Sequence, residues 1–433
     1  MFKLRDYQIK LSKEGLEILQ RKKFLYLALQ VRVGKTLTAL EICKLYGAKR
    51  VLFITKIKAF SSIQWDYDNF DYEPYFNLTI INKESIHKIE TDDFDVVVCD
   101  EAHGLFGTYP KINKFTKIYK KRFHNIPAIL LSGTMSPESY SQLFHQFWIN
   151  DFAPFTKYAN FYKWANEYVN IKLKYLGYAQ VKDYSDARKK DFWHLIRHHI
   201  LTYTQEQAGF TTTVNEMVLE VEMKPITYAI IKKLHKDLVV TSSTTGKTII
   251  ADTGVKLQQK THQLCSGTIK HEDGSIQIID DSKALFIKEK FKDYKIAIFY
   301  NFVAELQMLK NTFGAKLTTD LDEFNSSDKW IALQIVSGRE GISLAKADHL
   351  VFMNLQFSAV SYFQAKDRLT TISRKENTIF WIFARNGIEE KIYKAVMNKK
   401  DFTLNTFKKE YGIRATNSNK DNKEATPRRL ALS

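Results

Sequence analysis

The chain has few of the residues that stabilise extracellular or membrane proteins. It contains three cysteines, none at the C-x-x-C spacing of zinc or redox motifs, and only seven prolines among 433 residues. Such sparse cysteines exclude a disulfide framework. No apolar run reaches the roughly 18 residues of a membrane span, and the N-terminus lacks the apolar core of a signal peptide. We therefore expect neither secretion nor membrane insertion, and a cytoplasmic location.

Acidic residues are also scarce relative to basic ones. Lys and Arg total 65 against 48 Asp and Glu, which leaves a formal net charge of +17. A field of this sign attracts polyanions, so nucleic acid is the leading candidate partner, with a Lys-rich solvated face as the plainer interpretation. Residues 414–433 carry only +3 of this charge. They are polar and we expect them to be disordered, so most of the charge belongs to the folded body.

Short apolar runs rich in β-branched residues alternate with helical patterns in two parts of the chain. This alternation predicts an α/β fold in which parallel strands are covered by helices on both faces. In the first part we expect strands at residues 24–30, 50–55, 78–81, 95–100 and 128–132, and a helix at 35–46. In the second part we expect strands at residues 295–300, 330–336, 349–353 and 378–383.

The stretch between these blocks has a different pattern. Aromatic residues recur there at helical spacing, as in Phe155, Tyr158, Phe161, Tyr162 and Trp164. We interpret them as the core of a helical subdomain rather than as a base-stacking surface. The expected organisation is a first α/β domain at 1–137, a helical insertion and connecting segment at 138–281, a second α/β domain at 282–405, and a C-terminal extension at 406–433.

A phosphate-binding loop is predicted where the first strand meets the first helix. The segment Val33-Gly34-Lys35-Thr36-Leu37 follows an apolar strand and opens a helix, so its backbone N–H groups point at a bound anion. Lys35 would reach the β- and γ-phosphates of ATP, and the Thr36 hydroxyl would hold Mg²⁺. The first glycine of the full motif is absent, because Leu29 occupies its position.

A second Gly-Lys-Thr occurs at Gly246-Lys247-Thr248. It follows a Thr-rich stretch instead of an apolar strand, and the β-branched pair Ile249-Ile250 comes next. This context is typical of a turn or hairpin between residues 241 and 252. We therefore assign phosphate binding to the first copy alone.

Two adjacent carboxylates end another apolar strand. Val96-Val97-Val98-Cys99 leads into Asp100-Glu101-Ala102-His103. Both carboxylates then lie at the carboxyl edge of the sheet, where ligands bind in such folds. We expect Asp100 to coordinate Mg²⁺ and Glu101 to polarise the attacking water. A solvated loop is the alternative, and the phosphate-binding loop upstream argues against it.

Taken in order, these motifs resemble a superfamily 2 DEAH-box helicase or translocase of the Swi/Snf-like branch, and most closely the compact helicases of bacteriophages. The resemblance spans about residues 4–392. It implies two RecA-like domains that flank an ATP cleft, with a helical insertion after the first. Leu4-Arg5-Asp6-Tyr7-Gln8 resembles the adenine-reading Q motif, which implies that Gln8 contacts the base. The residues implied in coupling ATP state to domain movement are His103, Ser132, Gly133, Thr134, Gly341 and Gln364.

The second domain departs from the family pattern at motif VI. The family has two arginines three residues apart, and here the first is Arg368 while Thr371 occupies the second position. A guanidinium in the cleft normally offsets the charge on the γ-phosphate. Three interpretations follow: Arg368 suffices as a catalytic residue, Arg374 replaces the missing group, or hydrolysis is slow.

The resemblance implies an ATP-dependent DNA motor in replication or recombination. Its partner would be duplex or branched DNA ahead of RNA, and we expect a monomer on DNA, with other replication or recombination proteins as further candidates. Two alternatives remain: a nucleic-acid-binding protein with this fold but weak ATP hydrolysis, and an ATP-switched assembly factor whose partner is a protein.

Overall fold

The computed structural model describes residues 3–176, 179–210, 213–242, 245–335, 344–356, 376–394 and 428–430. They form two compact units, and the chain passes from the first to the second between Gly209 and Phe210. No helix within these ranges is long and apolar enough to cross a lipid bilayer.

The first unit contains a parallel sheet with six strands among the described residues, in the order β3-β2-β4-β5-β1-β8. Its strands are β1 (Phe24–Leu29), β2 (Arg50–Thr55), β3 (Asn77–Asn82), β4 (Val96–Cys99), β5 (Ala128–Leu131) and β8 (Ile200–Tyr203). Its helices are α1 (Asp6–Lys22), α2 (Lys35–Tyr46), α3 (Phe60–Asn69), α4 (Ala102–Phe106), α5 (Lys114–Phe123), α6 (Leu143–Gln146), α7 (Phe161–Tyr168) and α8 (Lys189–Ile196).

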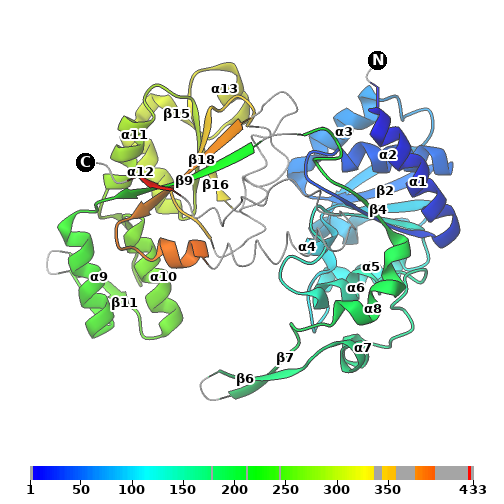
Figure 1. Ribbon diagram of the computed structural model, residues 1–433, viewed down its shortest axis with the longest axis horizontal. Coiled ribbons are helices and arrows are strands. Elements are labelled where there is room, and N and C mark those ends of the chain that lie inside the picture. Colours follow the sequence, from blue (N-terminus) through cyan, green and yellow to red (C-terminus); the bar gives the residue numbers. More distant parts are fainter. Residues whose placement is uncertain are drawn as a thin grey trace, which may run out of the picture. The chain divides into compact units, whose positions relative to one another are not determined.

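Helices cover both faces of this sheet (Figure 1). Strand β1 illustrates this arrangement, because all of its side chains are buried and successive side chains point to opposite faces of the sheet. Phe24, Tyr26 and Ala28 pack into a core shared with α4, α5 and α6, whereas Leu25, Leu27 and Leu29 pack into a core shared with α1 and α2. A strand that is buried on both faces consists of consecutive apolar residues, which explains the unbroken apolar run of β1.

Residues 138–209 leave the sheet after β5 and return to it as β8. On the way they form a hairpin of β6 (Lys172–Leu176) and β7 (Ala179–Asp183), which projects away from the sheet of this unit (Figure 1). Phe155, Phe161 and Trp164 are fully buried beside α6, so the predicted aromatic core is present. Tyr162 differs, because its side chain is 43% exposed.

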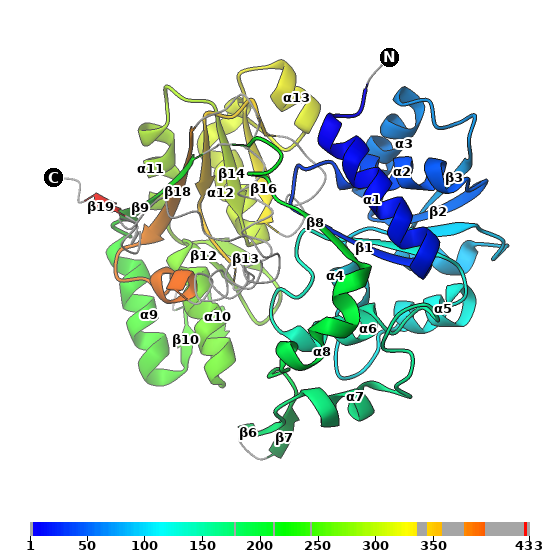
Figure 2. The same ribbon diagram turned by 45° about the vertical axis from the view of Figure 1, so that its right-hand side comes forward.

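The second unit contains a parallel sheet in the order β15-β16-β14-β17-β18-β9-β19. Its strands are β9 (Thr213–Val221), β14 (Ile296–Tyr300), β15 (Leu317–Thr318), β16 (Trp330–Gln334), β17 (His349–Phe352), β18 (Glu376–Ala384) and β19 (Arg428–Leu430). The helices around it are α11 (Ser282–Lys290), α12 (Val303–Phe313) and α13 (Leu321–Ser326). Two further helices, α9 (Pro225–Asp237) and α10 (Gly254–Cys265), lie side by side in both views (Figure 2).

Small antiparallel hairpins accompany these two helices. They are formed by β10 (Val239–Thr241) with β11 (Thr248–Ile250), and by β12 (Thr268–Lys270) with β13 (Ile276–Ile278). The hairpin of β10 and β11 confirms the one predicted around the second Gly-Lys-Thr.

The second unit also contains a buried ion pair. Lys283 of α11 donates to Glu389 at 2.6 Å, and both side chains are fully buried.

The predicted fold class, two α/β units that each contain a parallel sheet, is confirmed. The expected insertion at 138–281 needs correction, because that stretch is divided between the units. Its first part adds β8 beside β1, and its second part adds β9, which pairs with β18 over its full length. The expected disordered tail also needs correction at one place, since Arg428–Leu430 pairs with β9 as β19.

Candidate active site

The loop between β1 and α2 is held by the start of the chain. Gly34 has φ +81°, and a Cβ at this position would lie 2.2 Å from Nε2 of Gln8. Gln8 is buried, its Oε1 accepts from the Arg5 backbone N–H at 2.9 Å, and the Tyr7 hydroxyl donates to the Val33 carbonyl at 3.2 Å. The segment that resembles a Q motif therefore lies directly against the predicted phosphate loop.

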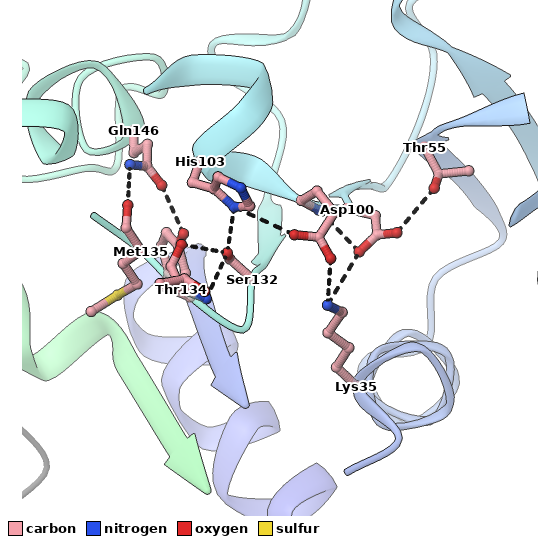
Figure 3. Close-up of polar contacts among 10 residues, drawn as sticks. Lys35, Thr55, Asp100, His103, Ser132, Thr134, Met135 and Gln146 are labelled. Atoms are coloured by element: carbon pink, nitrogen blue, oxygen red, sulfur yellow. Dashed lines mark hydrogen bonds and ion pairs between the residues drawn. The ribbon is translucent and has the colours of Figure 1, made fainter. Parts of the chain in front are cut away.

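Lys35 begins α2 and points at the two carboxylates that follow β4 (Figure 3). Its Nζ lies 2.8 Å from Oε1 of Glu101 and 4.0 Å from Oδ1 of Asp100. The Thr55 hydroxyl, at the end of β2, donates to Oδ2 of Asp100 at 3.0 Å. Thr36 is the second residue of α2 and is half-buried. The structure thus brings together the lysine and the carboxylates that the sequence analysis singled out.

The order of the strands explains this convergence. Strands β1, β5 and β4 are parallel neighbours, so their carboxyl ends share one edge of the sheet. The loop with Lys35 leaves β1, Ser132 follows β5, and Asp100 follows β4. Gly133 packs against the loop after β1, since a Cβ there would lie 3.3 Å from Cγ2 of Val31.

The two carboxylates are in different electrostatic states. Burial raises the pKa of Asp100 above its ordinary value, and the neighbouring charge of Glu101 adds to that rise although Lys35 opposes it. Burial also acts to raise the pKa of Glu101, but the charges of Lys35 and His103 outweigh it and bring this pKa to about 2. Glu101 is therefore firmly ionised, whereas the charge of Lys35, 4.0 Å from Asp100, does not outweigh the burial of Asp100.

Glu101 is held in a strained backbone conformation. Its φ is +49°, a left-handed value that non-glycine residues seldom adopt, and it caps the short helix α4. From that helix, Nδ1 of His103 lies 3.4 Å from Oε2 of Glu101 and 2.8 Å from Oγ of Ser132. The side chain of Glu101 is thus contacted by Lys35 on one oxygen and by His103 on the other.

Sequence reasoning missed Thr55, which belongs to this cluster, and the buried hydrogen bond between Tyr26 and Gln146 in the same unit. Thr55 ends a strand parallel to β4, and its place at the same sheet edge was the available signal. Tyr26 lies within an apolar strand, and Gln146 lies among aromatic residues of α6. Their phenol and amide meet at 2.7 Å across 120 residues of chain, a contact that no local pattern indicates.

Several predicted residues fall outside the described part of the chain. They are Arg368, Thr371 and Arg374 of motif VI, with Gln364, and Gly341 of motif V. Val33 and Leu37 lie within it and pack into the core shared by α1 and α2.

No family model matches the chain, and no curated protein matches it. Among solved structures, it is similar to the Sulfolobus solfataricus SWI2/SNF2 ATPase core in complex with dsDNA, with 17% identity, coverage of 94% of this chain and 93% of that chain, and a TM-score of 0.40. A second structure, of the Sulfolobus solfataricus SWI2/SNF2 ATPase core domain, has 16% identity, covers 94% of this chain and 90% of that chain, and gives a TM-score of 0.39.

Proposed function

We propose that this protein binds ATP at the edge formed by β1, β5 and β4 and hydrolyses it as a DNA-dependent motor of the Swi/Snf-like type. The observation that carries the proposal is the Lys35–Glu101 ion pair at 2.8 Å, between a helix N-terminus and a firmly ionised carboxylate. Neither side chain is fully buried, with 16% and 18% exposed, so an incoming phosphate has access to the lysine.

Lys35 would exchange Glu101 for the γ-phosphate when ATP enters. Backbone N–H groups at the start of α2 would hold the phosphates, and Gln8 would contact the adenine. Released from Lys35, the Glu101 carboxylate is free to orient and deprotonate the attacking water. Arg368 is the proposed arginine from the second unit.

The residues present fit Mg²⁺. Asp100 and the Thr36 hydroxyl offer the hard oxygen ligands that this ion prefers. Burial raises the pKa of Asp100 although Lys35 lies 4.0 Å away, so a further nearby cation would favour its ionised form. When bound, the ion would neutralise charge that develops on the phosphates.

DNA is the proposed partner because of the net charge of +17 and the family resemblance of the motifs. The compact bacteriophage-type branch, and a role in replication or recombination, are part of this proposal. Binding directed at the DNA backbone predicts that affinity falls steeply as salt rises, because each neutralised phosphate releases counterions.

The test is ATP hydrolysis by wild type and Glu101→Gln, measured without nucleic acid and with single-stranded, duplex, forked and four-way DNA and with RNA. We expect DNA to stimulate the wild type, and Glu101→Gln to bind ATP but to hydrolyse it about 100- to 10,000-fold more slowly, the usual contribution of a general base. Glu41→Gln is the matched control, since Glu41 is also paired with a lysine, Lys44 at 3.6 Å, within helix α2. Absence of stimulation by every nucleic acid would overturn the motor function.

A second candidate function is nucleic-acid binding with weak hydrolysis, and Thr371 in motif VI motivates it. Thr371→Arg restores the family pattern. A large gain in hydrolysis rate over wild type would favour this candidate, and an unchanged rate would remove its basis.

A further inference from the structure

The loop after β8 is hydrogen-bonded to the loop that follows β1. Nε2 of Gln205 donates to the Val31 carbonyl at 2.9 Å, and the Gln205 backbone N–H donates to Oε1 of Gln30 at 2.6 Å. Because a backbone carbonyl only accepts and a backbone N–H only donates, the orientations of both side-chain amides are fixed. Gln205 therefore contacts the chain two residues before the predicted phosphate-binding segment, which begins at Val33.

The position of Gln205 is itself fixed by the turn that contains it. The Thr204 N–H donates to Oε1 of Gln207 at 2.9 Å, and the Gln207 N–H donates to Oγ1 of Thr204 at 3.1 Å. The Gln30 N–H donates to the Tyr203 carbonyl at 3.0 Å, which extends the pairing of β1 with β8. The side chain of Gln205 thus approaches Val31 from an anchored backbone.

Residues 30–33 form a β-turn. The Val33 N–H donates to the Gln30 carbonyl at 3.3 Å, and φ is +69° at Arg32, the third residue, but not positive at Val31, the second. Positive φ at the third residue alone is the pattern of a type II turn. This position favours glycine, because a side chain there is strained. A type I turn, in which φ of the third residue is negative, would suit an arginine better.

The two turn types orient the central peptide group in opposite directions. Here that group consists of the Val31 carbonyl and the Arg32 N–H, which point away from each other because the peptide bond is trans. The bond from Gln205 to the Val31 carbonyl is lost when this group turns over. A left-handed arginine costs about as much free energy as one hydrogen bond contributes, so Gln205 can decide between the two types.

The orientation of this peptide group bears on the candidate active site. Gln205 follows β8, which pairs with β1 on one side, whereas β5 and then β4 follow on the other side. Glu101, which comes after β4, lies on that other side. With its carbonyl partner bonded to Gln205, the Arg32 N–H points away from Gln205 and toward the side of Glu101. Backbone N–H groups directed in this way form concave binding sites for anions.

We infer that Gln205 is a positioning residue that holds residues 30–33 in the turn whose Arg32 N–H faces the phosphates of a bound nucleotide. The part of this inference that concerns the nucleotide rests on the proposed function. The hold on the turn does not, because it follows from hydrogen bonds and backbone angles of described residues. A loop that is formed before the ligand arrives improves affinity, because binding need not order it.

The first experiment replaces Gln205 by Met, which keeps an unbranched side chain but removes the donor. We expect the Kd for the non-hydrolysable analogue AMP-PNP with Mg²⁺, measured by calorimetry, to rise about three- to tenfold, the effect of one hydrogen bond. KM for ATP should rise by the same factor while kcat stays within about twofold, because the turn contributes to binding before the reaction. Gln64→Met is the matched control, since Gln64 donates to Asp68 at 2.8 Å on α3 instead. Equal Kd values for the two variants would overturn the inference.

Arg32→Gly tests whether Gln205 acts through the turn. Glycine adopts positive φ without strain, so the type II turn should persist without the bond from Gln205. We expect Gln205→Met to raise the Kd for AMP-PNP less than about twofold in the Arg32→Gly background, a smaller change than in the wild type. The comparison cancels any separate contribution of the arginine side chain, because both proteins of the second pair lack it. Equal fold-changes in the two backgrounds would contradict the role of the turn.

Hydrogen exchange of the nucleotide-free protein separates the turn from nucleotide binding. On a peptide that covers residues 30–36, we expect faster exchange in Gln205→Met than in wild type and in Gln64→Met, because the turn is then free to interconvert. Unchanged exchange in Gln205→Met would overturn the hold on the turn, whatever the affinity. Faster exchange in a chain that binds no AMP-PNP would instead overturn the proposed function and leave the role of Gln205 in the turn standing.

Discussion

The chain contains Gly-Lys-Thr twice, and the two copies occupy opposite kinds of structure. Gly34-Lys35-Thr36 joins a fully buried parallel strand to helix α2, and Nζ of Lys35 lies 2.8 Å from Glu101. Gly246-Lys247-Thr248 runs from the turn of an antiparallel hairpin into β11, and Nζ of Lys247 lies 2.9 Å from the Ser275 hydroxyl. One lysine is the partner of a carboxylate pair, and the other is the partner of a neutral hydroxyl.

The difference shows that the tripeptide acquires its chemistry from what surrounds it. A buried strand before it and a helix after it direct backbone N–H groups to one point, and a second strand brings the carboxylates there. A hairpin provides neither. Each residue of the second copy is therefore a matched control, within the same chain, for the corresponding residue of the first.

The largest difference is expected for the lysines. Lys35→Met should lower ATP hydrolysis at least about 100-fold, because it removes the cation proposed to contact the γ-phosphate. Lys247→Met should leave the rate within about twofold of wild type, as for most surface changes. Steady-state hydrolysis at saturating DNA measures both. Equal losses would mean that the comparison between the two copies is wrong.

The glycines should differ less. Both have positive φ, +81° at Gly34 and +67° at Gly246, but only at Gly34 would an added Cβ meet another residue, Gln8 at 2.2 Å. We expect Gly34→Ala to raise KM for ATP about tenfold because the phosphate loop must shift. Gly246→Ala should cost about 1 kcal/mol of unfolding free energy, the usual penalty of a left-handed residue, and leave KM unchanged. Chemical denaturation beside ATP titration distinguishes the two effects.

The threonines should give the smallest contrast. Thr36→Ala removes a proposed Mg²⁺ ligand, so the Mg²⁺ concentration for half-maximal hydrolysis should rise about tenfold, toward the low end for lost metal contacts. Thr248 faces Thr241 across the hairpin, with their hydroxyl oxygens 3.1 Å apart. Its replacement by alanine should cost only about 0.5 kcal/mol of stability, as for other cross-strand pairs. An identical Mg²⁺ dependence in both variants would argue against Thr36 as a ligand.

In both sheets, the strands that consist of consecutive apolar residues could be predicted from the sequence, because a strand buried on both faces contains few polar residues. The apolar pattern did not predict Ile200–Tyr203 or Thr213–Val221 as sheet strands, although they pair with β1 and β18; for the second, only the family resemblance implied an extended segment leading to a helix. Ile200–Tyr203 is short and follows a helical pattern. Thr213–Val221 carries Asn215, Glu216 and Glu220 among its apolar residues, which weakens the signal of a buried strand.

Those residues of the candidate site that belong to short local motifs could be predicted from the sequence. Lys35, Asp100 and Glu101 were each identified from the strand that precedes them, and strand order then accounts for their meeting. The Tyr26–Gln146 contact is different in kind. It depends on how α6 packs against β1, and a tyrosine inside an apolar strand looks like any other core residue.

The left-handed backbone conformation of Glu101 determines which kind of selection would keep a glutamate at this position. A non-glycine residue at φ +49° raises the free energy of the folded chain by about 1 kcal/mol, which glycine would relieve. Glycine there would also remove the proposed base. Selection for stability alone would therefore erode this position early, and only selection for activity would keep a glutamate where the backbone prefers none.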